Sequence, residues 1–417
     1  MNIYLIIILV ILAGEYLLNC LVEALNISHA EPELPPEFSG IYDQEKYSRS
    51  QRYLKDTTCF FLVKAGVSLA VVIAFILAGG FNYLDQWVRS VFIYGEIRQG
   101  LLFAAVLMLG SQLLNLPFAL YRTFVLEERY GFNRTTKATF FSDLGKGLIL
   151  GGLIGGIAFS AVIWFFLQTG TAAWAWCWVA LTLFQLFLMF ISPVVIMPLF
   201  NKFVPLAQGE LRTAIEDYAA KENFKLQGIF TMDGSRRSTK SNAFFTGLGK
   251  YKRIALFDTL IQKHTVKELV AVLAHEMGHY KKKHIFKMIA MSVLTTGLML
   301  FFLSLFIKNK GLFAAFRMED LSVYASLIFF GFLYAPLQMV FSVISNIFSR
   351  KYEYEADAYS VATYKDPQAM IDALSKLSVD NLSNLTPHPW KVFLEYSHPP
   401  VLQRIRAIRR IAENDKP

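Results

Sequence analysis

Long apolar blocks separated by short charged segments dominate the chain from its first residues to residue 347. Crossing the hydrocarbon core of a bilayer takes roughly 20 mostly apolar residues in a helix, and seven blocks meet that length. A short turn around Gly170 separates the fourth block from the fifth, which predicts a helical hairpin. The first block lacks a basic leader, so we interpret it as a retained anchor rather than a signal peptide. The blocks cover about residues 3–24, 58–81, 100–121, 147–169, 173–200, 285–307 and 321–347.

Composition favours a membrane protein over a soluble one. Hydrophobic residues make up 54% of the chain and charged residues 18%, whereas soluble domains carry about a quarter charged residues. The cysteines Cys20, Cys59 and Cys177 are odd in number and each lies in an apolar block. This pattern argues against a disulfide framework and against a cysteine metal site.

Basic residues are distributed unevenly between the two ends of the predicted spans, and this bias accounts for most of the net charge of +9. Lys and Arg accumulate on the cytoplasmic side of membrane proteins. One set of segments holds 4, 5, 15 and 10 of them, and the opposite set holds 2 and 3. We therefore expect an outward-facing N-terminus, a cytoplasmic catalytic loop and no nucleic-acid partner. The basic set is 25–57, 122–146, 201–284 and 348–417, and the opposite set is 82–99 and 308–320.

The blocks divide the chain into four predicted regions. The first five spans and their loops come first, followed by a cytoplasmic loop, the last two spans and a C-terminal cytoplasmic segment. Within the fourth span, glycines recur every four residues at Gly147, Gly151 and Gly155, which predicts close packing against another helix. The four regions are 1–200, 201–284, 285–347 and 348–417.

The loop 201–284 mixes helical and strand patterns. Residues 207–222 have helical periodicity, and residues 226–233 and 251–257 have the composition of two paired strands. The polar segment 234–247 connects them. A short sheet with an exposed edge would bind an extended peptide by strand addition. An ordinary hairpin is the alternative, and the pattern does not decide between the two.

The end of this loop carries the motif His-Glu-x-x-His on a helix-forming segment. Residues four apart share a helical face, so the imidazoles of His275 and His279 can reach one ion, and imidazole is a common zinc ligand. Glu276 follows the first ligand and can take a proton from the attacking water. The sequence therefore predicts a zinc hydrolase site. The alternative is a pair of surface histidines on an amphipathic helix.

A catalytic zinc site needs a third protein ligand. His284 does not fit the metzincin spacing, because Lys282 replaces the glycine and His284 comes one residue early. We expect an interfacial role for His284. Glu353 is the better candidate, and Asp357, four residues later on the same helical face, would hold a zinc-binding histidine by a hydrogen bond. Glu355 is expected to point elsewhere, and a solvated acidic helix start is the alternative for the whole segment.

The last polar motif surrounds Pro399 and Pro400, which interrupt the chain before a basic helix. His398 and Arg404 flank this break. Both side chains are suited to donate hydrogen bonds to a tetrahedral oxyanion or to substrate carbonyls. By itself the segment is a turn followed by a basic amphipathic helix.

Together, these motifs resemble the type I CAAX prenyl protease family, which consists of zinc proteases with seven transmembrane helices. The resemblance covers almost the whole chain and follows a fixed order of motifs. It implies a mainly α fold, in which the helices form a hollow barrel around a hydrated chamber and a small α/β cytoplasmic domain covers the metal site. The matching motifs are Ser-Asn-Ala-Phe-Phe at 241–245, Phe-Asp-Thr-Leu at 257–260, His-Glu-Met-Gly-His at 275–279, Arg-Lys-Tyr-Glu-Tyr-Glu-Ala-Asp at 350–357, and Ser-His-Pro-Pro at 397–400 with Arg404.

The resemblance also implies a set of site roles. One Zn²⁺ per chain would be bound by His275, His279 and Glu353, with Glu276 as the base. His398 and Arg404 would assist the transition state, and Asn242 and Ala243 would hold the substrate backbone at a sheet edge. Eukaryotic members of the family remove the last three residues of farnesylated CAAX proteins. The chain departs from the family at Lys240, where a histidine often stands.

The substrate and the membrane remain open at this stage. The partners expected are the lipid bilayer and a peptide or protein substrate, with or without a farnesyl group. The chain carries no retrieval signal for the endoplasmic reticulum, so a bacterial inner membrane and a quality-control role are alternatives to the endoplasmic reticulum and CAAX processing. Glu15 and Lys64 lie within spans and suggest a transporter, and a non-catalytic chaperone is a further alternative. The complete set of motif residues argues against both.

Overall fold

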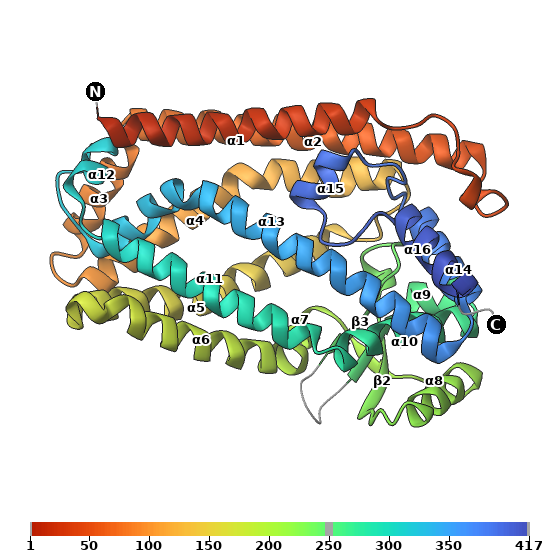
Figure 1. Ribbon diagram of the computed structural model, residues 1–417. Coiled ribbons are helices and arrows are strands. Elements are labelled where there is room, and N and C mark those ends of the chain that lie inside the picture. Colours follow the sequence, from red (N-terminus) through yellow and green to blue (C-terminus); the bar gives the residue numbers. More distant parts are fainter. Residues whose placement is uncertain (1, 247–252, 415–417) are drawn as a thin grey trace.

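The computed structural model describes residues 2–246 and 253–414 and is mainly helical. Among these residues, seven helical segments are long and apolar enough to cross a membrane, as the sequence predicts. Figure 1 shows them extending along the long direction of the molecule. They contain α1 (Ile3–Ser28), α2 (Gln44–Leu77), α4 (Glu96–Tyr121) continued by the π-helical turn Arg122–Glu127, α5 (Lys137–Gln168), α6 (Ala173–Ile191) between the turns Gly170–Ala172 and Ser192–Ile196 and followed by α7 (Met197–Phe200), α11 (His284–Phe306) and α13 (Val323–Tyr364).

Shorter elements close the two ends of the molecule. At the end that contains the N-terminus lie α3 (Gly80–Val91) and α12 (Lys310–Ala315) (Figure 1). The opposite end contains the strands and most of the remaining helices. These elements are β1 (Phe203–Pro205), α8 (Glu210–Lys221), β2 (Gly228–Met232), β3 (Ala243–Thr246), β4 (Arg253–Phe257), α9 (Asp258–Lys263), α10 (Val266–Lys281), α14 (Pro367–Asp380), α15 (Pro389–Glu395) and α16 (Val401–Asn414), with single turns at Pro36–Phe38 and Gly234–Arg236.

Ion pairs tie the loops into the same two groups that the basic residues define. One group lies at the end with the N-terminus, and the other surrounds the strands. Each pair joins segments far apart in the sequence, so the spans are fixed at both ends by polar contacts outside their apolar parts. The pairs are Lys308–Glu96 at 2.9 Å and Arg89–Asp320 at 3.5 Å in the first group, and Arg406–Glu37 at 2.7 Å and Arg237–Asp143 at 2.7 Å in the second.

The membrane helices pack along narrow seams. In the most apolar stretch of each span, at most 17% of the residues are buried. In the described segment 170–200, that stretch has no buried residue. A helix in a solid bundle would bury a whole face, so this sparse burial indicates a hollow wall one helix thick, as expected for a barrel. Several cavities open between the helices. One of about 600 Å³ lies between α5, α6, α11 and α13, and one of about 1010 Å³ lies between α2, α3 and α4.

Gly147, Gly151 and Gly155 of α5 do not lie at a close contact with another helix, contrary to the sequence prediction. A Cβ atom built on Gly147, Gly151 or Gly155 would meet no described atom within 4 Å. Close approach occurs instead at Gly100 of α4, where a Cβ would lie 2.7 Å from the Cβ of Tyr324 on α13. The prediction failed because a four-residue spacing defines a helical face but not what that face contacts.

One unbroken helix carries the seventh span beyond the membrane. α13 has 42 residues, which is about 63 Å of helix and about twice the thickness of the hydrocarbon core. Ser322 caps its first turn, and Lys365 ends it in the left-handed backbone region with φ of 59°. The predicted span 321–347 is therefore the first part of a longer helix, whose last turns carry Glu353 and Asp357.

A four-stranded sheet with the order β1-β2-β4-β3 forms in the described part of the loop 201–284. The two predicted strands pair in parallel, with Gly228 opposite Arg253. Parallel neighbours require a crossover connection, so the hairpin alternative is wrong. Part of that connection forms β3, which begins at Ala243, pairs antiparallel with β4 and lies at the edge of the sheet. Residues 251 and 252, the predicted start of the second strand, lie outside the described residues.

The end with the sheet has an apolar core of its own, built around α10. The residues of α10 from Leu269 to Ala274 are all buried, and a helix that is apolar on every side is enclosed by its neighbours. Ile254 and Leu256 of β4 pack against one side of α10. α13 contacts another side, where Ser360 Oγ donates a hydrogen bond of 2.9 Å to the Ala271 carbonyl. α10 is thus held in place before its last turns, which carry the histidines.

Gly278, between the two histidines, tests how closely α10 approaches α13. A Cβ here would lie 3.0 Å from the Ala356 Cα and 3.1 Å from the Tyr359 Cβ. Alanine gains about 1 kcal/mol of helix propensity over glycine, but overpacking against backbone costs about 1–3 kcal/mol. We expect Gly278→Ala to lower the midpoint of thermal unfolding in detergent and Gly278→Val to lower it further.

The matched control for this prediction is Gly151→Ala on α5. Its new Cβ would meet no described atom within 4 Å, so its unfolding midpoint should equal or exceed that of the wild type. A Gly278→Ala protein as stable as this control would show that the two helices are not in tight contact.

Candidate active site

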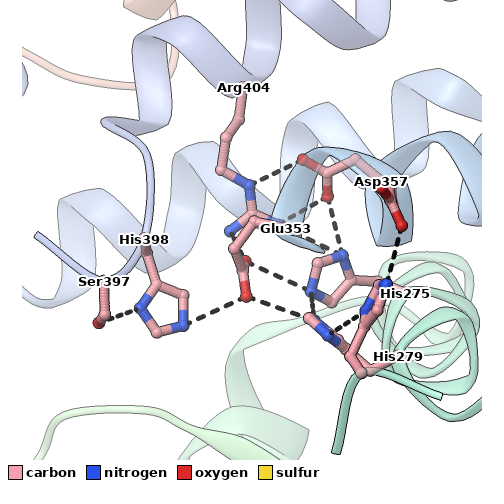
Figure 2. A network of polar contacts seen from close by, with 9 residues as sticks. His275, His279, Glu353, Asp357, Ser397, His398 and Arg404 are labelled. Carbon is pink, nitrogen blue, oxygen red and sulfur yellow. Dashed lines mark hydrogen bonds and ion pairs between the residues drawn. The ribbon is translucent and has the colours of Figure 1, made fainter. Parts of the chain in front are cut away.

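Two helices deliver the predicted metal ligands to one place. α10 supplies His275 and His279 from its last turns, and α13 supplies Glu353 and Asp357 (Figure 2). His275, Glu353 and Asp357 are buried, with exposed fractions of 6%, 4% and 1%. The site therefore forms where α13 has left the predicted span and packs against α10.

One nitrogen or oxygen atom from each of His275, His279 and Glu353 lies within 4.8 Å of the other two. The Nε2 atoms of the two histidines are 3.2 Å apart. Glu353 faces both, with Oε2 3.5 Å from His275 Nε2 and Oε1 3.3 Å from His279 Nε2. Three donor atoms thus converge from two helices, as the sequence motif requires.

The donor set fits a metal ion. Glu353 Oε2 is buried and accepts no hydrogen bond among the described residues, although it lies 3.1 Å from the charged Nη1 of Arg404, and buried polar atoms are normally hydrogen-bonded. Two imidazoles and one carboxylate are the protein ligands of many catalytic zinc sites. A cation between them would satisfy the carboxylate oxygen and both ring nitrogens together.

Asp357 fixes the orientation of His275. Its Oδ1 lies 2.8 Å from His275 Nδ1, so His275 donates from Nδ1 and directs the lone pair of Nε2 toward His279 and Glu353. Burial alone would lower the pKa of His275, but the hydrogen bond and negative charge of Asp357 outweigh burial and raise this pKa. The prediction for Asp357 agrees with this geometry, and such partners strengthen the ligand they orient.

Arg404, from the first turn of α16, is buried in the site and pairs with carboxylates. Its Nε and Nη2 donate to the two oxygens of Asp357 at 2.8 and 2.6 Å, and its Nη1 lies 3.1 Å from Glu353 Oε2. Burial opposes the charge of Arg404, but Asp357 and Glu353 raise its pKa above the ordinary value. The guanidinium group of Arg404 is therefore paired with the metal-site carboxylates, whereas the sequence predicts that it donates to an oxyanion or to substrate carbonyls.

Glu276 is partly buried, one residue after His275 on α10. Burial raises the pKa of its carboxyl group, and the positive charge of the two histidines and of Arg404 opposes that rise. A raised pKa makes a carboxylate a stronger proton acceptor, which suits a general base.

His398 reaches the site from the turn before α16 (Figure 2). Its Nε2 lies 3.4 Å from Glu353 Oε1, and its Nδ1 lies 3.0 Å from the hydroxyl of Ser397. The side chain is 65% exposed. The imidazole is therefore accessible to a substrate and also lies next to the metal group, by which we mean His275, His279 and Glu353.

The predicted substrate-binding residues lie at the start of the edge strand. Asn242 is exposed, its side-chain oxygen accepts from the Ala243 N–H at 2.8 Å, and its carbonyl accepts from the Phe257 N–H at 3.1 Å. Asn381, which the sequence analysis missed, contacts both backbone groups of Ser241 at 3.3 and 3.4 Å. The chain entering β3 is thus fixed from both sides.

Lys240 anchors the same segment. Its amino group lies 2.9 Å from the Tyr53 hydroxyl, 3.1 Å from Glu127 Oε2 and 4.2 Å from the centre of the Phe132 ring. These contacts connect the start of β3 to α2 and to the π-helical turn after α4. The lysine at this position therefore has a structural role that its sequence context did not reveal.

The sequence predicts an interfacial role for His284, and the structure buries this side chain next to the proposed metal ligand His279. His284 is the first residue of α11, is only 2% exposed and stacks on Tyr352 with ring centres 4.3 Å apart. Its Nδ1 lies 3.1 Å from His279 Nδ1, and its Nε2 lies 3.0 Å from Glu355 Oε2. The metzincin spacing concerns only whether a third histidine binds the metal. It therefore could not reveal that His284 contacts the proposed ligand His279.

Comparisons with protein families match both halves of the chain. Residues 23–202 match the model described as CAAX prenyl protease N-terminal, five membrane helices, and residues 205–412 match peptidase family M48. The chain is 36% identical to a CAAX prenyl protease 1 homolog of Oryza sativa, with 90% of each chain covered. It is 32% identical to the Homo sapiens homolog, over 91% of this chain and 90% of the relative.

A solved structure has the same overall fold. The crystal structure of Ste24p from S. mikatae superposes with a TM-score of 0.92 at 32% sequence identity, covering 98% of this chain and 99% of the other. The helices and the sheet thus share one arrangement across nearly the full length of both chains.

The fork of Arg404 can be tested by Arg404→Lys, which keeps the charge but loses the planar set of donors. Because Asp357 would lose its paired hydrogen bonds, we expect Zn²⁺ affinity to fall about 10- to 100-fold. Leaving the buried carboxylate poorly satisfied should also cost about 1–3 kcal/mol of stability. Chelator competition and thermal unfolding measure the two effects.

Arg406→Lys is the control, since Arg406 lies on the same helix but pairs with Glu37 at the surface, where its side chain is 53% exposed. Both quantities should stay close to wild type in that variant. Equal Zn²⁺ affinity in the two variants would contradict the role of Arg404 as a partner of Asp357.

Proposed function

The chain belongs to the CAAX prenyl protease family of M48 metallopeptidases, and from this we propose that it cleaves prenylated CAAX-type proteins with one zinc ion per chain. Family membership makes it an integral multi-pass membrane protein and a metalloendopeptidase with a peptide or protein substrate. The observation that carries the proposal is the convergence of His275, His279 and Glu353 on one point, with Glu276 next to the first ligand.

We assign the catalytic unit to residues 201–284 and 348–417, and the membrane part to residues 1–200 and 285–347. Contacts of Ser360 with Ala271 and of Asp357 with His275 support this division, because they join the two catalytic segments across the intervening spans. The division also keeps each ionisable site residue outside the predicted spans.

In the proposed reaction, His275, His279 and Glu353 hold the zinc ion. A zinc ion bound there would supply Lewis acidity, the property that makes a water molecule nucleophilic near neutral pH. Glu276 takes a proton from the attacking water and delivers it to the leaving amine as the C–N bond breaks. His398 donates a hydrogen bond to the developing oxyanion. Arg404 acts as a positioning residue through Asp357, a revision of its role that its ion pairs favour.

The edge strand β3 supports a substrate bound in extended form. A peptide that pairs with this edge gains backbone hydrogen bonds without requiring a particular sequence. Asn242 and Ala243 stand where the edge begins, and the side-chain amide of Asn242 would donate to a substrate carbonyl. Asn381 and Lys240 hold the chain before that point, so the edge is ordered before substrate arrives.

The cavity between α5, α6, α11 and α13 is consistent with the proposal that the substrate is prenylated. Its walls are largely apolar and include Met288, Met291 and Met299, and its volume of about 600 Å³ is typical of small-molecule sites. Ser345 lines it and precedes Glu353 on α13 by eight residues, about 12 Å of helix. An isoprenoid on the residue beside the cleaved bond could therefore enter the cavity while the peptide stays at the metal.

The substitution Glu276→Gln tests the assignment directly. It removes the proposed base but no metal ligand, so we expect bound zinc to stay near one per chain and turnover of a farnesylated CAAX peptide to fall about 10²- to 10⁴-fold. Zinc content by atomic absorption and cleavage by mass spectrometry, with and without a chelator, give the two readouts.

Glu216→Gln, on the surface of α8, is the matched control and should retain full activity. If wild-type protein binds zinc but leaves the farnesylated peptide intact and cuts unprenylated or unfolded membrane proteins, the CAAX assignment is wrong and a quality-control function replaces it. If wild-type protein does not bind zinc, the proposed ligand set is wrong.

We further propose that the end with the sheet faces the cytoplasm, because the segments there are rich in Lys and Arg. In a background lacking Cys20, Cys59 and Cys177, single cysteines can be placed at Tyr94 near one end and Arg409 near the other, both of which are exposed. In intact cells or in sealed vesicles of known sidedness, a membrane-impermeant maleimide should label Tyr94→Cys from the non-cytoplasmic side and spare Arg409→Cys. The reverse pattern would overturn this orientation.

A further inference from the structure

The second proposed metal ligand, His279, has a partner of its own on the side opposite the metal group. Its Nε2 faces His275 and Glu353, while its Nδ1 lies 3.1 Å from His284 Nδ1. The far nitrogen of His284 in turn lies 3.0 Å from Glu355 Oε2. His279, His284 and Glu355 therefore form a continuous hydrogen-bonded chain that leads away from the metal group.

Only one arrangement of protons satisfies every contact of this chain while leaving His279 able to bind a metal. A metal on His279 Nε2 requires the ring proton on Nδ1, which then donates to His284 Nδ1. His284 must accept there, so its own proton lies on Nε2, where it donates to the Glu355 carboxylate. If His284 Nδ1 donated instead, neutral His284 would present a lone pair to that carboxylate, which is unfavourable. Glu355 thus determines the tautomer of His279 through His284.

Local structure holds the relay in place. α10 ends at Lys281, and the turn to α11 passes through Lys283 in the left-handed region with φ of 58°, so that His284 follows as the first residue of α11. His284 stacks on Tyr352 with an angle of 13° between the ring planes, and its side chain is 3% exposed. The ring is therefore fixed in the plane that both hydrogen bonds need.

The geometry resembles that on the other side of the metal group. There Asp357 of α13 contacts His275 directly, and here Glu355 of the same helix reaches His279 through one intervening imidazole. His284 is not a member of the metal group itself, because the atom it directs at His279 meets Nδ1 and not the metal-facing Nε2.

We propose that His284 and Glu355 are positioning residues that orient His279 and hold it in its metal-binding tautomer. This inference rests on the proposed metal ligands and adds two residues to the machinery that holds the ion. It predicts a role in metal affinity for two side chains that would not bind the ion themselves and do not belong to the substrate edge.

The test measures Zn²⁺ affinity of the full-length protein in detergent by competition with a chromophoric chelator. His284→Phe keeps a flat ring on Tyr352 but removes both nitrogens, and we expect affinity to fall about 10- to 100-fold. His284→Asn retains an acceptor for His279 Nδ1 and should lose less affinity than His284→Phe. Glu355→Ala, at a partly exposed side chain, removes only the last acceptor and should also weaken binding.

The matched control is His264→Phe. His264 is a buried histidine whose Nδ1 lies 2.9 Å from Glu268 Oε2, at the N-terminal end of α10 and away from the metal group. Its loss should lower the thermal midpoint of the zinc-free protein but leave Zn²⁺ affinity within about twofold of wild type. A positioning role separates the two readouts in this way, whereas general destabilisation would not.

Affinities within twofold of wild type in both His284→Phe and Glu355→Ala would overturn the proposal. So would an equal loss in His264→Phe, since it would trace the effect to stability. If His284→Phe does not fold, Glu355→Ala and His284→Asn decide the question. Wild-type protein that binds zinc tightly but does not cleave CAAX peptides would refute the proposed substrate and leave the relay standing.

Discussion

The contact between α10 and α13 is the interaction on which the rest of the site depends. Neither helix carries a complete metal site, since α10 provides the two histidines and α13 provides the acidic ligand. Gly278 allows the backbones to approach within a distance that a side chain would prevent, and the hydrogen bond from Ser360 to Ala271 fixes the same contact two turns earlier on α10. The sheet and α8 enclose the other sides of α10, which leaves its histidines little freedom.

The negative charge of the buried carboxylates explains why the proposed metal ligands have so many polar partners. Glu353 and Asp357 are buried carboxylates, and burying a charge is costly unless it is paired. Arg404 offsets one of them and contacts both, so one negative charge remains, and an ionised Glu276 adds another. A divalent cation balances this excess. Because an unbalanced buried charge is costly, the site favours the metal-bound form of the protein, in which these charges are neutralised.

Much of the fold and site could be predicted from the sequence, because both depend on local patterns. Apolar block length gave the seven spans, and helical spacing placed His275 with His279 and Glu353 with Asp357. The parallel pairing of β2 and β4 was not predictable, since the residues of two short strands do not specify whether the strands pair parallel or antiparallel. The open face of Gly151, the ion pairs of Arg404 and the buried position of His284 were missed for a related reason. Each depends on which distant segment packs there, and the spacing of residues along one element does not specify its neighbour.

The length of α13 has a mechanical consequence. From Val323 to Glu353 the helix spans 30 residues, about 45 Å, so one degree of tilt about its outer end moves the carboxylate by about 0.8 Å. Catalytic geometry tolerates displacements of about 0.5 Å, and helices change tilt when bilayer thickness changes. A change in lipid thickness that tilts α13 would therefore displace Glu353 relative to the scissile bond. Turnover should therefore respond to acyl-chain length in a way that a soluble peptidase with the same ligands would not.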